Sequence, residues 1–422
     1  MLTVLSNSWA LFLGLLLLMI GNGLQGTLLG LRGAIEGFDA STMAWVMSAY
    51  FAGFLFGSRV TPHMIQRVGH VRVFAALASL ISAGFILYAA VPNAAAWAAT
   101  RLVVGFCFSG VYVVCESWLN DASTNDTRGK TLSLYMITQM VGIVSAQGIV
   151  NLADAGEYAL FVVMSVLVSI SFAPILLSAT PAPMFQGTKP MTLRQLFATS
   201  PLGCVGMFFM GGVFSAMFGM AAVYGSEKGL SVADISLFVA VMYLGGMILQ
   251  YPIGWLSDRM DRRRLITIMC MVAAVTMLVA SFLAASFAVL LVAAFALGGL
   301  SNPLYSLLIA YTADYLQPED LAAASGGLMF INGAGAVAGP FIVGWMMTGL
   351  GPDFFFVFMF ANFTLIAGYG LWRMTRRAAP TVEETTSYAP VAPQASVVAV
   401  EAAQEYAVEQ AEAEAPANSA RS

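Results

Sequence analysis

A positive charge lies inside an apolar stretch of this sequence. Arg101 is one to two turns from the start of the stretch 95–119, and an ionised group at such a depth in a bilayer costs at least ~2.5 kcal/mol unless partners or water solvate it. On a helical wheel, Gly105, Tyr112 and Glu116 fall within about 60° of Arg101, as does Phe108. This largely polar or small stripe should face a cavity, which makes Arg101 a candidate binding residue.

The neutral partners expected for this guanidinium are Asn22 and Gln25, which lie three residues apart in the first apolar stretch. In the alternative interpretation, Arg101 only holds its own helix against the first one. Further amide and aromatic side chains occur in other apolar stretches, where each one alone could equally be a hydrogen-bonding contact between helices. Together they predict a cavity that suits an uncharged or singly charged organic solute. The predicted cavity residues are Asn22, Gln25, Arg101, Tyr112, Gln139, Tyr243, Asn302, Tyr305 and Asn332.

A second set of charged residues gathers near the ends of apolar stretches. Glu116 could titrate if it were desolvated, but it lies close to the end of its stretch and near basic loops, which favours a salt bridge at a gate. It is also fifteen residues from Arg101, or ~22 Å along a helix at 1.5 Å per residue, too far for direct pairing. The predicted gate residues are Arg67, Glu116, Arg128, Asp258, Arg259, Arg262 and Asp314.

The elements that position these residues are apolar helices. The 422-residue chain is 59% hydrophobic and 9% charged, whereas soluble domains carry about 25% charged residues. Stretches of ~20 apolar residues, the length that spans a bilayer, recur up to about residue 375. We predict an all-α integral membrane protein with twelve transmembrane helices, at 9–31, 42–61, 71–91, 95–119, 131–152, 158–179, 202–224, 233–253, 265–283, 287–313, 322–350 and 354–374.

The positive charges predict the orientation. With the N-terminus inside, cytoplasmic segments hold fourteen Lys and Arg residues, whereas outside loops hold only Arg32 and Lys228. Since positive loops stay on the cytoplasmic side, both termini of a multi-pass membrane protein should be cytoplasmic. The segment 378–422 carries seven Glu against one Arg and lacks helical periodicity. We predict that this acidic tail is disordered and that its truncation leaves activity nearly intact.

The sequence also repeats internally. A shift of 193 residues places Gly105 on Gly298 and Asp121 on Asp314, and the loop 66–70 matches 258–262 at a shift of 192. The repeat predicts two parallel six-helix halves, 1–180 and 202–377, joined by a cytoplasmic linker at 181–201. Parallel repeats of this kind suit a carrier whose site lies between the halves near the membrane midplane.

Several motifs resemble those of the major facilitator superfamily, and in particular its YcaD-like branch of bacterial carriers. The loop 254–264, GWLSDRMDRRR, is similar to the family's G-x-L-x-D-R-x-G-R-R signature, with Asp261 in place of a glycine. The first-half copy is weaker, because Pro62 and Gln66 stand where Gly and Asp would be. Further similarity covers Arg101-x-x-x-Gly105, the segment 116–120, the segment 311–314 and the glycines of 332–340. The resemblance implies the twelve-helix fold, a place in the bacterial inner membrane and secondary transport by alternating access.

These observations predict a secondary active transporter of a small organic solute, coupled to an ion gradient, with protons as the candidate ion. Uptake by symport is favoured slightly, because the Gly-Pro motif of drug antiporters is missing from 142–148, and a flavin-like vitamin is one candidate solute. The alternatives are a multidrug or metabolite efflux antiporter and a transporter-like receptor without net transport. We expect no enzyme, since His63 and His70 are the only histidines. We also expect no metal, no cofactor and no nucleic-acid partner, but a monomer in the lipid bilayer.

Overall fold

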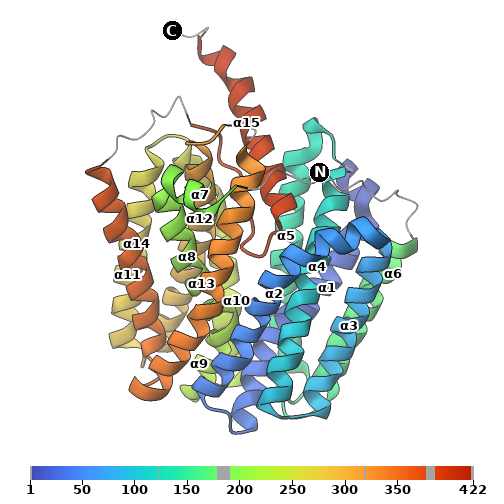
Figure 1. Cartoon of the computed structure of the whole chain (residues 1–422). Coiled ribbons are helices and arrows are strands. Elements are labelled where there is room, and N and C mark those ends of the chain that lie inside the picture. The colour runs from blue at the N-terminus through green and yellow to red at the C-terminus, as the bar shows by residue number, and fades with distance from the viewer. Residues whose placement is uncertain (1, 122, 178–190, 318–319, 377–384, 420–422) are drawn as a thin grey trace.

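The computed structural model describes residues 2–121, 123–177, 191–317, 320–376 and 385–419, and its regular elements there are helices (Figure 1). They are α1 (Leu2–Ile35), α2 (Ala40–Val68), α3 (His70–Ala90), α4 (Ala94–Asp121), α5 (Asn125–Ile149), η1 (Val150–Leu152), α6 (Ala159–Leu177), α7 (Leu193–Thr199), α8 (Pro201–Ser215), the π-helical η2 (Ala216–Met220), α9 (Ala221–Glu227), α10 (Val232–Ser257), α11 (Arg262–Leu283), α12 (Phe287–Ala313), α13 (Leu321–Leu350), α14 (Phe354–Met374) and α15 (Val397–Ser419).

Eleven helices of the described chain are long and apolar enough to cross a membrane. One of these spans, Pro201–Glu227, is built from α8, η2 and α9. The apolar part of α6, Ala159–Pro174, is shorter. The predicted all-helical, multi-pass membrane class is therefore confirmed. The predicted linker 181–201 contains the short helix α7, which Thr192 begins with a capping box, and its residues 181–190 lie outside the described ones.

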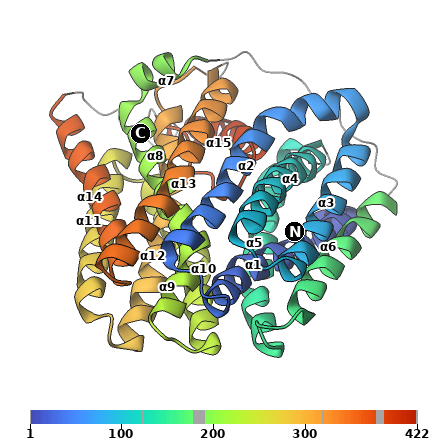
Figure 2. The same cartoon turned by 60° about the horizontal axis from the view of Figure 1, so that its bottom comes forward.

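The spanning helices pack into two neighbouring groups, which lie on opposite sides of Figures 1 and 2. In the first group α1 contacts α5 and α6, α3 contacts α4 and α6, and α2 packs along α4. In the second, α8 contacts α13 and α14, α11 contacts α12 and α14, and α10 packs along α12. The groups meet where α2 contacts α13, α1 contacts α9 and α5 contacts α10.

Two glycine contacts recur at the positions that the internal repeat relates. A Cβ on Gly105 would lie 2.0 Å from the carbonyl oxygen of Tyr50, and one on Gly298 would lie 1.8 Å from that of Met242. Only glycine leaves room for the backbones of α2 and α4, and of α10 and α12, to approach so closely. The α2–α4 and α10–α12 pairs therefore use the same packing.

One end of the bundle, which we call the basic face, carries the connections from α2 to α3, α4 to α5, α10 to α11 and α12 to α13. The opposite end, the far face, is closed by direct contacts between the two groups. The backbone N–H of Ser41 donates to Thr348 Oγ1 at 3.0 Å, and the rings of Trp45 and Phe341 meet edge to face at 4.5 Å. A Cβ on Gly30 would lie 2.7 Å from Ala222.

At the basic face the C-terminal segment lies between the two groups. The chain enters at residue 385, runs inward without regular structure, and continues as α15, which projects from the bundle (Figure 1). Val391, Ala392 and Ala395 are buried, and α15 contacts α4 and α5 of one group and α13 of the other. Residues 385–410 bury apolar and polar groups against the bundle, whereas the sequence predicted a disordered tail. Residues 378–384 and 420–422 lie outside the described part.

Candidate functional site

A small cavity of about 50 Å³ lies between the two groups of helices. One wall comes from α1, α2, α4 and α5, and the other from η2, α9 and α10. Its lining is aromatic, amide and small, and Arg101 is the one charged side chain among the described residues that line it. The lining residues are Asn22, Gly23, Gly26, Thr27, Tyr50, Phe51, Arg101, Ile143, Gln147, Met217, Phe218, Ala221, Ala222, Val239, Tyr243 and Gln394.

Arg101 is buried, with 4% of its surface exposed. Its guanidinium lies 4.6 Å from the centre of the Tyr50 ring, and Nη2 is 3.1 Å from the sulfur of Met47. Tyr88 is a further neutral neighbour of the guanidinium. These groups are neutral, and a cation over an aromatic face is stabilised by the ring's quadrupole. The environment therefore holds the charge in place without neutralising it.

The expected partners of Arg101 make other hydrogen bonds. Asn22 donates to the Tyr112 hydroxyl at 3.2 Å, and Gln25 donates to the Tyr88 hydroxyl at 3.2 Å. Gln25 thus bonds to a neutral neighbour of Arg101. The sequence carried no information about the tyrosines that lie between these residues.

Of the nine predicted cavity residues, three line the cavity: Asn22, Arg101 and Tyr243. Tyr243 stacks on Phe218, with ring centres 5.5 Å apart. The other six are buried in the surrounding packing. Asn332, for example, donates to the carbonyl of Met207 at 3.0 Å and so joins α13 to α8. These six are Gln25, Tyr112, Gln139, Asn302, Tyr305 and Asn332.

Five of the predicted cavity residues carry a buried polar atom without a hydrogen-bond partner in the described structure. Buried polar groups are bonded in the large majority of cases, so each exception marks a place where a solute or water would be stabilised. The atoms are Gln25 Oε1, Arg101 Nε, Gln139 Nε2, Asn302 Oδ1 and the Tyr305 hydroxyl.

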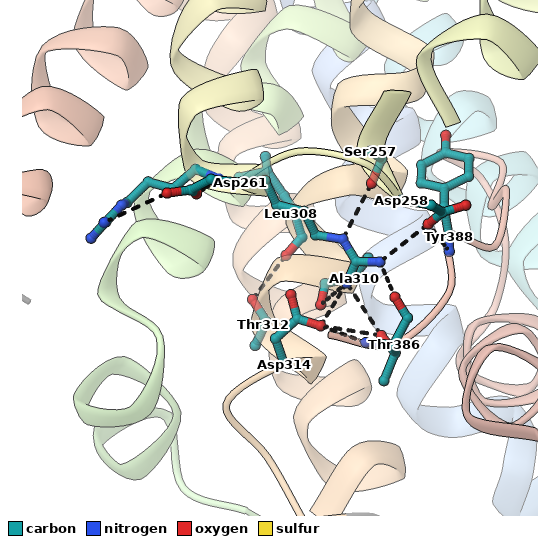
Figure 3. A network of polar contacts seen from close by, with 11 residues as sticks. Ser257, Asp258, Asp261, Leu308, Ala310, Thr312, Asp314, Thr386 and Tyr388 are labelled. Atoms are coloured by element: carbon teal, nitrogen blue, oxygen red, sulfur yellow. Dashed lines mark hydrogen bonds and ion pairs between the residues drawn. The ribbon is translucent and has the colours of Figure 1, made fainter. Parts of the chain in front are cut away.

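Three gate residues of the second group, Asp258, Arg262 and Asp314, form a network around Arg262 (Figure 3). Arg262 Nη1 lies 2.6 Å from Asp314 Oδ1, each side chain being 2% exposed, and its Nη2 lies 3.6 Å from Asp258. It also donates to Ser257 Oγ at 3.2 Å and to the backbone oxygen of Thr386. Burial raises the pKa of the Asp314 carboxyl, while the Arg262 charge opposes that shift. The ion pair joins α11 to α12, and the network also extends to the C-terminal segment, which the predicted bridges between helices did not include.

The remaining gate residues lie apart from this network. Glu116 accepts hydrogen bonds from the Tyr135 hydroxyl and, at 2.8 Å, from the backbone N–H of Ser396. The predicted salt bridge of Glu116 is therefore replaced by hydrogen bonds to α5 and to the C-terminal segment. Arg128 pairs instead with Glu405 at 3.1 Å and Glu409 at 3.3 Å. The other two are exposed: Arg259 stacks on the Trp255 ring at 4.2 Å, and Arg67 ends α2.

The set of predicted site residues did not include the C-terminal segment or the aromatic residues around Arg101. Tyr50 and Tyr88 are neither charged nor amide, so they resembled ordinary core residues. In the tail, one signal was present: Glu401, Glu405 and Glu409 follow one another at four-residue intervals in an Ala-rich run, a spacing that puts them on one helix face.

Comparisons with known proteins agree with this geometry. The model of the Major Facilitator Superfamily matches residues 11–279 and 202–403. A protein of Escherichia fergusonii, named an uncharacterized MFS-type transporter YcaD, is 25% identical over 371 residues, which is 87% of this chain and 96% of that protein. A YcaD protein of Escherichia coli is 26% identical over 359 residues, covering 84% and 92%.

Solved structures are similar in fold. The crystal structure of the nucleoside transporter NupG has a TM-score of 0.72 and 15% sequence identity, and covers 88% of this chain and 99% of that chain. The crystal structure of a D-xylose-proton symporter has a TM-score of 0.69 and 14% identity, and covers 90% and 99%. At these identities the similarity concerns the fold.

Proposed function

This chain belongs to the Major Facilitator Superfamily, in its YcaD-like branch, and we propose that it moves a small organic solute across a bacterial inner membrane by alternating access. Membership of the family confirms the prediction of a membrane transporter rather than an enzyme. The observation that carries the proposal is the cavity between the two helix groups, with the buried charge of Arg101 in its wall.

The chemistry of the cavity narrows the solute class. Its described lining contains one cation, several amide or hydroxyl groups and aromatic rings. A sugar phosphate or a metal ion would require several opposite charges, whereas one guanidinium among neutral groups suits a solute with a single anionic or strongly accepting group. The stacked pair Phe218 and Tyr243 suits a flat ring in the same molecule. A compact aromatic metabolite that carries one acid group fits this description.

The topology that we propose has twelve spans in two parallel halves, with α6 as the twelfth span and both termini in the cytoplasm. The eleven long apolar helices, the shorter α6 and the related glycine contacts of α2–α4 and α10–α12 support it. Reporter fusions after Val91 and after Leu152 should report the outside, and fusions in the connection 66–70 should report the cytoplasm. A cytoplasmic signal at Leu152 would contradict this topology.

The function is tested by solute accumulation in membrane vesicles that contain the purified carrier. Vitamins, nucleosides and aromatic acids are screened with and without a proton gradient. Accumulation that stops when the gradient collapses supports coupled uptake, whereas loss of preloaded solute under the same gradient identifies efflux. Saturable binding without movement of any solute would identify a receptor and contradict the proposal.

A further inference from the structure

The C-terminal segment is bonded to both groups of helices at the basic face. Towards the second group, Ser306 of α12 donates to the carbonyl of Val391 at 3.1 Å and accepts from its N–H at 2.9 Å. Further along, Ser325 of α13 donates to Gln404 at 2.7 Å. These bonds give buried polar groups of the tail hydrogen-bond partners, as in a specific binding site.

The bonds towards the first group come from the same segment. The backbone N–H of Ser396 donates to Glu116 of α4, and Glu405 and Glu409 pair with Arg128 of α5. The ring of Tyr406 covers Gly129, where a Cβ would lie 2.4 Å from it. The segment thus spans the gap between the two groups.

Gln394 brings this segment to the central cavity, because it is one of the lining residues together with Arg101. A second cavity, of about 530 Å³, lies between α5 and α10, and Tyr388, Pro390 and Tyr406 form part of its wall. Tyr388 is fixed there by its N–H to Asp258 at 2.8 Å and by Gln250, which donates to its hydroxyl at 2.8 Å. The tail therefore occupies space on the path from the central cavity to the basic face.

We propose that residues 385–409 are an intramolecular plug, which fills the basic-face opening of the carrier and blocks the path between the central cavity and the cytoplasm. This inference rests on the proposed function, because the basic face is cytoplasmic only in that topology. The far face is already closed by contacts between helices of the two groups, so the conformation is inward-facing with its opening occupied. The plug must leave before a solute can pass and before the two groups can close at the basic face.

The contacts also indicate how the plug is held. Thr386 bonds to Arg262, which lies in the signature loop 254–264, and to Asp314 at the end of α12. Tyr388 bonds to Asp258 of the same loop. In this structure Arg262, Asp314 and Asp258 therefore bond to the plug. The plug competes with any bonds that these three residues make to other partners when the basic face closes.

The test uses a single cysteine at Phe51 of the cavity wall, in a chain whose four native cysteines are replaced by alanine. Two lengths are compared, a chain that ends at Pro380 and a matched control that ends at Gln410 and keeps the plug. In inside-out vesicles, a membrane-impermeant maleimide should label the shorter chain several-fold faster than the control. A synthetic peptide of residues 385–410 should slow the labelling of the shorter chain again. Equal labelling rates for the two chains would overturn the plug.

A second measurement keeps the chain at full length, in case the shorter one does not fold. Ser325→Cys and Gln404→Cys are joined by a short, cleavable thiol cross-linker. The maleimide should then label Phe51→Cys slowly until the linker is cut. Fast labelling of the cross-linked chain would contradict the plug. Neither measurement needs a solute. The plug proposal can therefore be supported even if the vesicle screen finds no transport, and transport can be found even if the labelling experiments contradict the plug.

Discussion

At the scale of the residue, the neutral surroundings of Arg101 leave its charge available for binding a solute. A buried guanidinium beside a carboxylate would form a closed pair, but here the contacts are with Met47, Tyr50 and Tyr88. The charge is thus oriented by the protein and left available to an anionic or accepting group of a solute. Stacking on an aromatic face also requires the planar guanidinium, which a lysine does not have.

We therefore predict that Arg101→Ala lowers transport at least about tenfold at normal abundance in the membrane, since a hydrogen bond to a charged group contributes about 1.5–3 kcal/mol and 1.4 kcal/mol is a factor of ten. Arg101→Lys should keep partial activity at most. Arg72→Ala, which changes an exposed arginine of the basic face, is the matched control. Uptake in vesicles measures all three, and near-normal rates for Arg101→Ala would exclude Arg101 from binding.

A second prediction concerns Asp314. Removing one partner of a buried ion pair costs about 3–5 kcal/mol, because the other charge stays buried, whereas an exposed pair is worth about 0–1 kcal/mol. Asp314→Asn should accordingly lower the melting temperature of the detergent-solubilised carrier clearly. Glu405→Gln, which weakens the more exposed pair with Arg128, should change it little. Similar melting temperatures for the two variants would show that the Arg262–Asp314 pair does not stabilise the fold.

The sequence predicted the polar residues of the site better than their contacts. Arg101, Asn22 and Tyr243 lie on the cavity wall, because charged and amide side chains in an apolar helix are costly unless they face a cavity or a partner. The partners themselves depended on tertiary structure. Tyr50 and Tyr88 come from α2 and α3, and nothing in a single helix shows which aromatic ring of a neighbour will lie over a guanidinium.

At the scale of the element, close backbone approach at a glycine is part of what joins α10 to α12 and α2 to α4. An added methyl group at Gly298 would meet the carbonyl oxygen of Met242 at 1.8 Å, and a backbone atom cannot rotate away. Overpacking of this kind typically costs about 1–3 kcal/mol.

Gly298→Ala and Gly105→Ala should therefore both lower the melting temperature in detergent. Gly368→Ala on α14 is the control, because nothing lies within 4 Å of the added Cβ and alanine favours helices. It should leave the melting temperature unchanged or raise it. If all three variants melt together, the close approach of these helices is not what stabilises the two pairs.

Hydropathy predicted the membrane helices because lipid leaves few solutions other than a helix for an apolar stretch of spanning length. The same signal could not predict the tail. Residues 385–396 are short, partly polar and without periodicity, and their order comes from distant partners such as Ser306 and Glu116. In α15, Ala and Glu favour a helix, but the side that it packs against is set by Arg128 and Ser325.

At the scale of the whole molecule, the two groups of helices touch directly at the far face and along α2 and α13, and the tail lies between them at the basic face. Alternating access requires that these two regions exchange roles, since a carrier that opened at both ends would be a channel. The far-face contacts between α2 and α13 must therefore break in each transport cycle, while contacts inside one group should persist.

The last prediction tests this exchange with two cysteine pairs in a chain whose native cysteines are replaced. Ser41→Cys with Thr348→Cys joins α2 to α13 across the two groups, at a site where N–H and Oγ1 are 3.0 Å apart. Ser82→Cys with Ser165→Cys joins α3 to α6 within one group, where the hydroxyl oxygens are 2.7 Å apart. Cross-linking the first pair should stop uptake of a solute found in the vesicle screen, and reduction should restore it. Cross-linking the second should leave uptake nearly unchanged, because that contact moves as part of a rigid group. Uptake that survives the first cross-link would show that the far face does not open, and the two-group mechanism would then be wrong.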